Sequence, residues 1–164
     1  MKKFLLFMMM LFSTTVFAES VNAKVTNKIN FGISPKELQN IIKSEPLSNS
    51  HDNGNYAVYY FANVEDPLGV KRQLNSFAFS ENHLFSAVFD SVTTDEEHAK
   101  IIEAYKKNIN KISKEKMNIK EHKGALLLYN SKKIIEIYRV VDHTFINVAL
   151  YSAGKLNNSL KNYE

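Results

Sequence analysis

The chain has 164 residues, of which 45% are hydrophobic and 23% charged, values typical of a globular protein rather than a disordered one. It contains no cysteine, which excludes disulfides, thiolate nucleophiles, thiolate metal sites and lipid anchors attached through cysteine. At this length we expect one domain, or two small modules that share a core.

Residues 1–18 carry the pattern of a secretory signal peptide. Lys2 and Lys3 precede an unbroken apolar run over residues 4–12, three hydroxyl residues end the run, and Val16-Phe17-Ala18 precedes the expected cut. The run is too short to span about 30 Å of hydrocarbon, so a membrane anchor is the less favoured alternative. We therefore expect cleavage between Ala18 and Glu19 and a periplasmic or secreted protein without a membrane span.

Loss of this segment changes the charge of the chain. It removes two of the 21 lysines and arginines and none of the 17 acids, so the net charge falls from +4 to +2. A charge this small does not favour nucleic acid as a partner.

The remaining sequence is divided by two strong helix starts. Residues 19–30 are a flexible lead. Ser34, Pro35 and Glu37 then form a capping box with proline at the first helical position, and the helix ends before Pro46. A loop over residues 48–55 is followed by strands at 56–61, 70–79 and 84–92.

The second helix start repeats this plan. Thr94 and Glu97 form another capping box. Residues 114–124 are a charged connection, strands follow at 125–129, 133–141 and 144–152, and residues 153–164 form a polar tail that is expected to fray.

These elements predict a single α+β domain over residues 31–152. It consists of two tandem helix-strand-strand-strand units, residues 31–92 and 93–152. Sequential strands joined by short turns favour an antiparallel meander sheet, with the helices packed on one face.

Two motifs carry a resemblance to a known group. Residues 31–38, FGISPKEL, and 77–84, FAFSENHL, resemble the small exported proteins related to the outer-membrane assembly lipoprotein SmpA/BamE and the β-lactamase inhibitor protein. That group has a G-x-S-x-x-E-L helix start and an F-x-F-x-x-x-x-L hairpin. The resemblance covers residues 31–152 and implies a non-enzymatic protein-binding module. The assembly lipoproteins carry a lipidated cysteine, which this chain lacks.

The expected hairpins place aromatic side chains on one sheet face. If Asp142-His143 is a two-residue turn, the aliphatic residues of the last hairpin point to the core. If Phe79 pairs with Leu84, the first hairpin adds two more aromatics, although a one-residue bulge would exchange its faces. The candidate partner-binding face comprises Phe77, Phe79, Tyr138, Phe145 and Tyr151. The alternatives are that the tail or a second subunit covers this face, or that strand propensity alone explains the aromatics.

No residue pattern points to catalysis. The five histidines lack metal-ligand spacing and are expected in solvent-facing turns and loops, and no nucleophile or nucleotide-binding motif is present. We therefore assign no catalytic, metal or cofactor residue and expect no enzyme. Residues 106–123 hold seven lysines and two glutamates, which we interpret as a solvated face rather than a surface for acidic partners.

The sequence thus favours an exported, non-enzymatic module that binds another envelope or extracellular protein. An inhibitor, an immunity-type protein or an envelope-assembly accessory protein is the sharper version. The alternative is an envelope hydrolase or sugar-binding protein that uses carboxylates on the sheet.

Overall fold

The computed structural model describes residues 23–51 and 55–163. The expected signal peptide and its cleavage point lie outside the described residues. The elements, in chain order, are α2 (Pro35–Ile42), β1 (Ser48–His51), β2 (Tyr56–Glu65), β3 (Lys71–Ser80), β4 (His83–Val92), α3 (Asp95–Lys107), α4 (Ile109–Ile112), β5 (Asn118–His122), β6 (Ala125–Tyr129), β7 (Lys133–Val140), β8 (His143–Leu150) and α5 (Ala153–Lys161).

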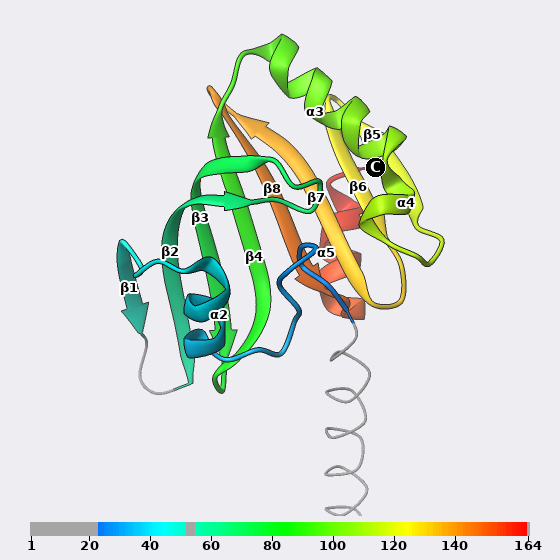
Figure 1. The fold of residues 1–164 in the computed structure, drawn as a ribbon. Coiled ribbons are helices and arrows are strands. Elements are labelled where there is room, and N and C mark those ends of the chain that lie inside the picture. Colours follow the sequence, from blue (N-terminus) through cyan, green and yellow to red (C-terminus); the bar gives the residue numbers. More distant parts are fainter. Residues whose placement is uncertain (1–22, 52–54, 164) are drawn as a thin grey trace, which may run out of the picture.

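The eight strands form one antiparallel sheet in the order β1-β2-β3-β4-β8-β7-β6-β5 (Figure 1). Each half of the chain supplies four neighbouring strands, and the halves meet where β4 pairs with β8. Helix α2 opens the first half, and α3 with α4 opens the second. The structure therefore confirms the predicted α+β class and its tandem units, although each unit has four strands rather than three.

The additional strand of each half lies at an edge of the sheet. The sequence predicts a loop where β1 lies and a charged connection where β5 lies, and both predictions are wrong. Every residue of β1 is exposed, as are four of the five residues of β5. Neither strand therefore shows the alternation of polar and apolar residues that reveals a half-buried strand.

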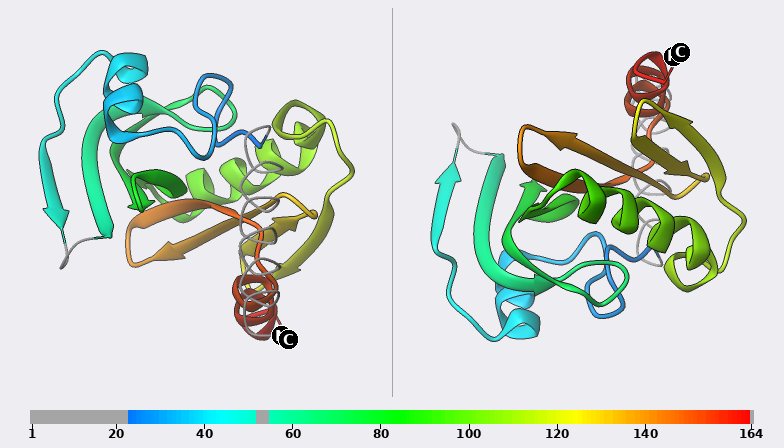
Figure 2. Two further views of the ribbon diagram at one scale, coloured as in Figure 1. Left: turned by 90° about the horizontal axis from the view of Figure 1, so that it is seen from below. Right: turned by 90° about the horizontal axis from the view of Figure 1, so that it is seen from above.

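Helices cover the two faces of the sheet differently. Helices α2, α3 and α4 lie against one face, as predicted, and bury Leu38, Ile102 and Ile112 in the core. Helix α5 occupies the polar tail expected to fray, and it lies on the other face, against the second half of the sheet (Figure 2). We call the first face the core face and the second the outer face. On the outer face of β1–β4, no helix of the described residues is present (Figure 2).

Both predicted helix starts are confirmed. The Ser34 hydroxyl accepts a hydrogen bond from the Glu37 backbone N–H, and the Glu37 carboxylate accepts one from the Ser34 N–H at 2.7 Å. Thr94 and Glu97 repeat the arrangement at α3. The bonds from Ser34 hold the pKa of the Glu37 carboxyl below its usual value.

Loss of the first cap is expected to be measurable. Ser34→Ala should lower the free energy of unfolding by about 1 kcal/mol, because the first turn of α2 loses an acceptor for its free N–H groups. Urea denaturation checks this, with Ser44→Ala as a control that removes an exposed serine outside the cap. An unchanged midpoint for Ser34→Ala would contradict a stabilising cap at this residue.

The last hairpin turns one residue earlier than predicted. The two turn residues are Val141 and Asp142 rather than Asp142 and His143, so Ile137 pairs with Ile146 and not with Val148. The pairing is thereby shifted by two residues, and a shift of two leaves every side chain on its face. The predicted aliphatic core set lies on the core face and packs in the core: Ile135, Ile137, Ile146, Val148 and Leu150.

The first hairpin contains the bulge that exchanges faces. Phe79 pairs with Leu84, as predicted, but the register then shifts and Phe85 has no partner on β3. Beyond this bulge Phe77 pairs with Ala87 on the core face. Phe77 and Phe79 are therefore buried in the core, at 0% and 1% exposure, and their assignment to the open face is wrong.

Candidate functional site

Of the five predicted site residues, the structure brings two together on the outer face. Tyr138 on β7 is the direct pairing partner of Phe145 on β8. Tyr151 follows β8 at its other end, where its N–H donates to the Lys132 carbonyl oxygen, so it lies apart from this pair. The residues that surround Tyr138 and Phe145 come from three strands.

These residues form what we call the strand-end surface. Pairing of β4, β8 and β7 aligns their side chains in two rows on the outer face, one row across Asp90, Phe145 and Tyr138 and the next across Val92, His143 and Val140. The turn residue Val141 completes the surface. It consists of Asp90, Val92, Tyr138, Val140, Val141, His143 and Phe145.

Its centre is a stack of three rings. The Tyr138 and Phe145 ring centroids are 5.5 Å apart with 26° between the planes, and the His143 ring lies 6.0 Å from Phe145 at 20°. The Asp90 carboxylate accepts a hydrogen bond from His143 Nδ1 at 2.9 Å. This bond raises the pKa of the His143 imidazole above its ordinary value and fixes the orientation of its ring.

The rim of the stack exposes aliphatic side chains. Val92 and Val140 are each 53% exposed, and Val141 is 83% exposed. Val141 has a φ of 57°, a region that β-branched residues rarely occupy, because it is the first residue of a two-residue hairpin turn.

A hollow of about 310 Å³ adjoins the stack beneath the end of the chain. The sheet contributes Glu136, Tyr138 and Asn147 to its lining. Helix α5 contributes Lys155, and Tyr163 follows that helix. The Glu136 carboxylate is already bound, to the Lys155 ammonium at 2.9 Å and to the Asn147 side-chain amide at 3.1 Å. Burial raises the pKa of the Tyr138 and Tyr163 side chains, which both line the hollow.

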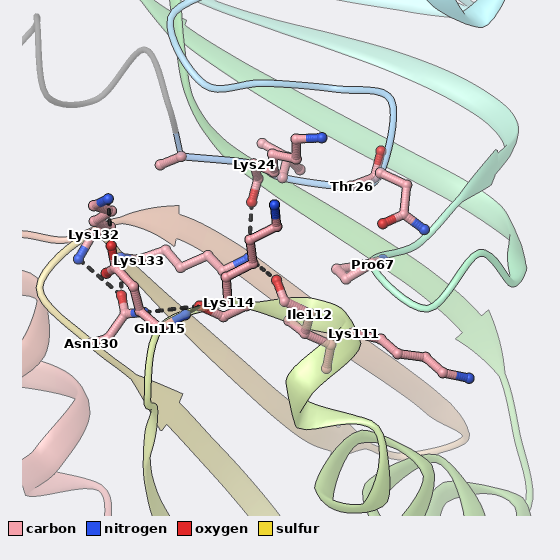
Figure 3. Close-up of a pocket in the computed structure, with 14 residues that line it drawn as sticks. Lys24, Thr26, Pro67, Lys111, Ile112, Lys114, Glu115, Asn130, Lys132 and Lys133 are labelled. Atoms are coloured by element: carbon pink, nitrogen blue, oxygen red, sulfur yellow. Dashed lines mark hydrogen bonds and ion pairs between the residues drawn. The ribbon is translucent and has the colours of Figure 1, made fainter.

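A second hollow, of about 360 Å³, is lined by residues 23–27 and Pro67 on one side and by residues of the segments 111–115 and 130–133 on the other (Figure 3). Its lining includes five lysines but one carboxylate, Glu115. Lys133 is 4% exposed, and its ammonium donates to the carbonyl oxygens of Lys24 at 3.0 Å and Ile112 at 2.7 Å. Burial lowers the pKa of Lys133 to about 8.

The hollow also divides the lysine-rich stretch of residues 106–123. Lys106 is bound to the carboxylates of Glu103 and Glu121, as expected for a solvated face. Lys111 and Lys114, in contrast, line the second hollow. The lysines of this stretch therefore lie in two different environments, an ion-paired surface and the lining of the second hollow.

The expectation of histidines in turns and loops is wrong: four of them lie in strands, and His98 lies in helix α3, where it is also buried. Its Nδ1 lies 2.9 Å from the Thr144 hydroxyl, and its Nε2 lies 2.6 Å from the Gly124 carbonyl oxygen. Because a carbonyl oxygen only accepts, Nε2 donates the proton of that bond. Both nitrogens thus tie α3 to the sheet. In residues 23–51 and 55–163 no three histidine, aspartate or glutamate side chains gather where they could hold a metal ion.

Sequence reasoning missed Lys133, although a signal for it existed. Lys133, Ile135 and Ile137 are spaced by two along β7, and side chains at this spacing share a face. Since the two isoleucines were assigned to the core, the lysine belonged there too.

Among the residues that the structure describes, no helix has the length and apolar character needed to cross a membrane. The resemblance to the assembly lipoproteins and the β-lactamase inhibitor protein stays a prediction. No protein-family model, no curated protein and no solved structure matches this chain.

Proposed function

We propose that this chain is an exported, non-enzymatic module that binds another protein of the envelope or the extracellular space through the strand-end surface. A protein that the module neutralises, as an inhibitor or immunity-type protein would, is the sharpest form of the proposal. The observation that carries it is the ring stack of Tyr138, Phe145 and His143, held in place by Asp90 and bordered by exposed valines.

The composition of this surface supports protein recognition. Binding energy at protein interfaces concentrates in a few aromatic side chains that are surrounded by residues able to exclude water. Tyr138 and Phe145 are the central aromatic side chains of this surface. The surrounding residues that can exclude water are Val92, Val140 and Val141. Because the rings are already stacked, little side-chain entropy would be lost on binding.

The neighbourhood of the surface also favours a macromolecular partner. None of the helices that the structure describes covers the outer face of β1–β4, which continues from this surface, and Leu74, 42% exposed, lies in the same row as Asp90 and Phe145. A partner could therefore extend across the sheet, while the hollow beside Tyr138 accepts one projecting side chain. The absence of cysteine leaves no thiol chemistry to consider at this surface.

Photo-crosslinking in the native envelope tests the proposal. A photoreactive phenylalanine analogue placed at Val140 or Val141 of the exported protein is expected to give one discrete protein adduct. The matched control is Ile119, an aliphatic strand residue of similar exposure, 50%, on the far edge strand β5. We expect no discrete adduct there.

A substitution then connects the adduct to the ring stack. Tyr138→Ala should weaken binding of the crosslinked partner by about 30-fold or more, the effect typical of a central aromatic at an interface. Equal adducts from Val140 and Ile119, or an unchanged affinity of the Tyr138→Ala variant, would refute binding through this surface.

A further inference from the structure

The buried ammonium of Lys133 has no counter-charge. Its two hydrogen bonds go to neutral carbonyl oxygens, and no carboxylate of the described residues pairs with it. A buried charge is ordinarily paired with an opposite one, because removal from water is costly. Of the three N–H groups of a lysine ammonium, two are used, and Lys133 lines the second hollow.

The surroundings of Lys133 add further positive charge. Lys24, Lys111, Lys114 and Lys132 line the same hollow, and the one lining carboxylate, Glu115, is 2.5 Å from the Lys132 ammonium. In Figure 3, Lys114 and Lys133 extend toward the same part of the hollow, whereas Lys111 points away from it. Like charges gathered around a cavity repel one another unless an anion lies between them.

The residue types indicate which anion fits. The planar guanidinium of arginine binds carboxylate or phosphate with two parallel bonds, but no arginine lines this hollow, so an anion here would be held by lysine ammonium groups. Lysine ammonium groups act as point charges and suit a phosphate group, whose oxygens point in several directions. Ser113 and the Asn130 amide also line the hollow and supply neutral polar groups.

From these observations we infer that the hollow beside Lys133 binds the phosphate group of a small anionic ligand. The phosphate supplies the counter-charge that the buried ammonium lacks, and Lys114 and Lys24 hold its remaining oxygens. The volume of about 360 Å³ admits a phosphate with a small organic substituent, either a soluble phosphate ester or the headgroup of an anionic phospholipid. This site is separate from the strand-end surface.

Titration with inorganic phosphate tests the inference. Binding to the exported protein is followed by amide NMR shifts at pH 7, with sodium chloride keeping the ionic strength constant. We expect saturable binding with shifts at Ser113, Asn130 and Lys133. The double variant Lys24→Gln/Lys114→Gln, which leaves the buried lysine intact, should bind about tenfold more weakly or worse.

A matched variant separates a site from general attraction. Lys107→Gln/Lys120→Gln removes the same charge from exposed residues outside the hollow and should bind as the unmodified protein does. Vesicles of phosphatidylglycerol, compared with vesicles of phosphatidylcholine, identify a lipid source if they bind and the Lys24→Gln/Lys114→Gln variant does not. Failure of both phosphate and phosphatidylglycerol to bind, or equal weakening in the two double variants, would overturn the inference.

Discussion

Ile137→Ala is expected to lower the free energy of unfolding by about 2–5 kcal/mol, whereas Tyr138→Ala should cost about 1 kcal/mol. Ile137 is fully buried on the core face and pairs with Leu126 and Ile146 on either side, so its truncation leaves a cavity. The next side chain, Tyr138, is half-buried on the outer face and loses mainly its stacking on Phe145.

Urea denaturation of both variants measures the difference. Ile137→Val provides a graded control, because removal of one methyl group from a packed site costs about 0.5–1.5 kcal/mol. Equally large losses from Ile137→Ala and Tyr138→Ala would mean that the strand-end surface is buried in solution. A second copy of the chain packed on that face would then replace the proposal of an open surface, and the oligomeric state would reveal it.

The last hairpin shows why this pair of residues could be assigned from sequence. The sequence predicts its turn one residue too late, yet the faces are right, because the resulting error in pairing is two residues and side chains alternate with a period of two. Alternation of aliphatic and polar residues is therefore a stronger signal than the turn itself. Tyr138 and Phe145 were assigned to the outer face on this basis.

The first hairpin shows where the same reasoning fails. One extra residue, Phe85, exchanges the faces on one side of the bulge, so a correct pairing of Phe79 with Leu84 still gave the wrong face for Phe77 and Phe79. In a strand as aromatic as β3, both faces carry apolar residues, and composition alone does not locate a bulge.

A different reason explains why the elements with little burial were not predicted. The edge strands β1 and β5 are almost fully exposed, and within α5 Ser159 is the buried residue. Their positions are determined by pairing and packing with distant parts of the chain, which leaves no local periodicity. The second hollow likewise joins segments more than 100 residues apart, since Lys133 contacts the backbone of Lys24.

Lys133 is also expected to make the folding stability depend on pH. Its pKa is about 8 in the folded protein, against 10.5 for an unperturbed lysine, so between these values the unfolded chain binds more protons than the folded one. Folding stability therefore rises as pH increases through this window. From pH 7 to 9.5 the gain is about 2 kcal/mol, since each pH unit inside the window contributes about 1.4 kcal/mol.

The geometry explains why deprotonation is tolerated. A neutral amine keeps two N–H groups, which match the two carbonyl oxygens of Lys24 and Ile112, while its charge and the cost of burying it disappear. Three tyrosines act on folding stability in the opposite direction at higher pH. Burial raises the pKa of Tyr105, Tyr138 and Tyr163, so the stability that they contribute is lost above about pH 10.

Comparison with Lys133→Met isolates the lysine from these other groups. The variant retains the tyrosines and the other charged residues that line the hollow, which are Lys24, Lys111, Lys114, Lys132 and Glu115. At a single pH the substitution has two opposing effects on the free energy of unfolding. Methionine removes a buried charge, which stabilises the fold, but it leaves two carbonyl oxygens without a donor, which destabilises it. The difference in unfolding free energy between the two proteins, measured in urea at pH 7 and pH 9.5, should change by about 2 kcal/mol in favour of the unmodified chain.

Parallel pH profiles of the unfolding free energy for the two proteins would contradict a depressed lysine pKa.

Added phosphate is expected to change the pH dependence of the unmodified protein. An anion seated against Lys133 stabilises the ammonium and raises its pKa toward the ordinary value, so the rise in stability should move to higher pH when phosphate is added. The Lys24→Gln/Lys114→Gln variant keeps the buried ammonium but weakens the anion site. It should therefore show the rise between pH 7 and 9.5 whether or not phosphate is present, which distinguishes a bound counter-charge from a general effect of salt on stability.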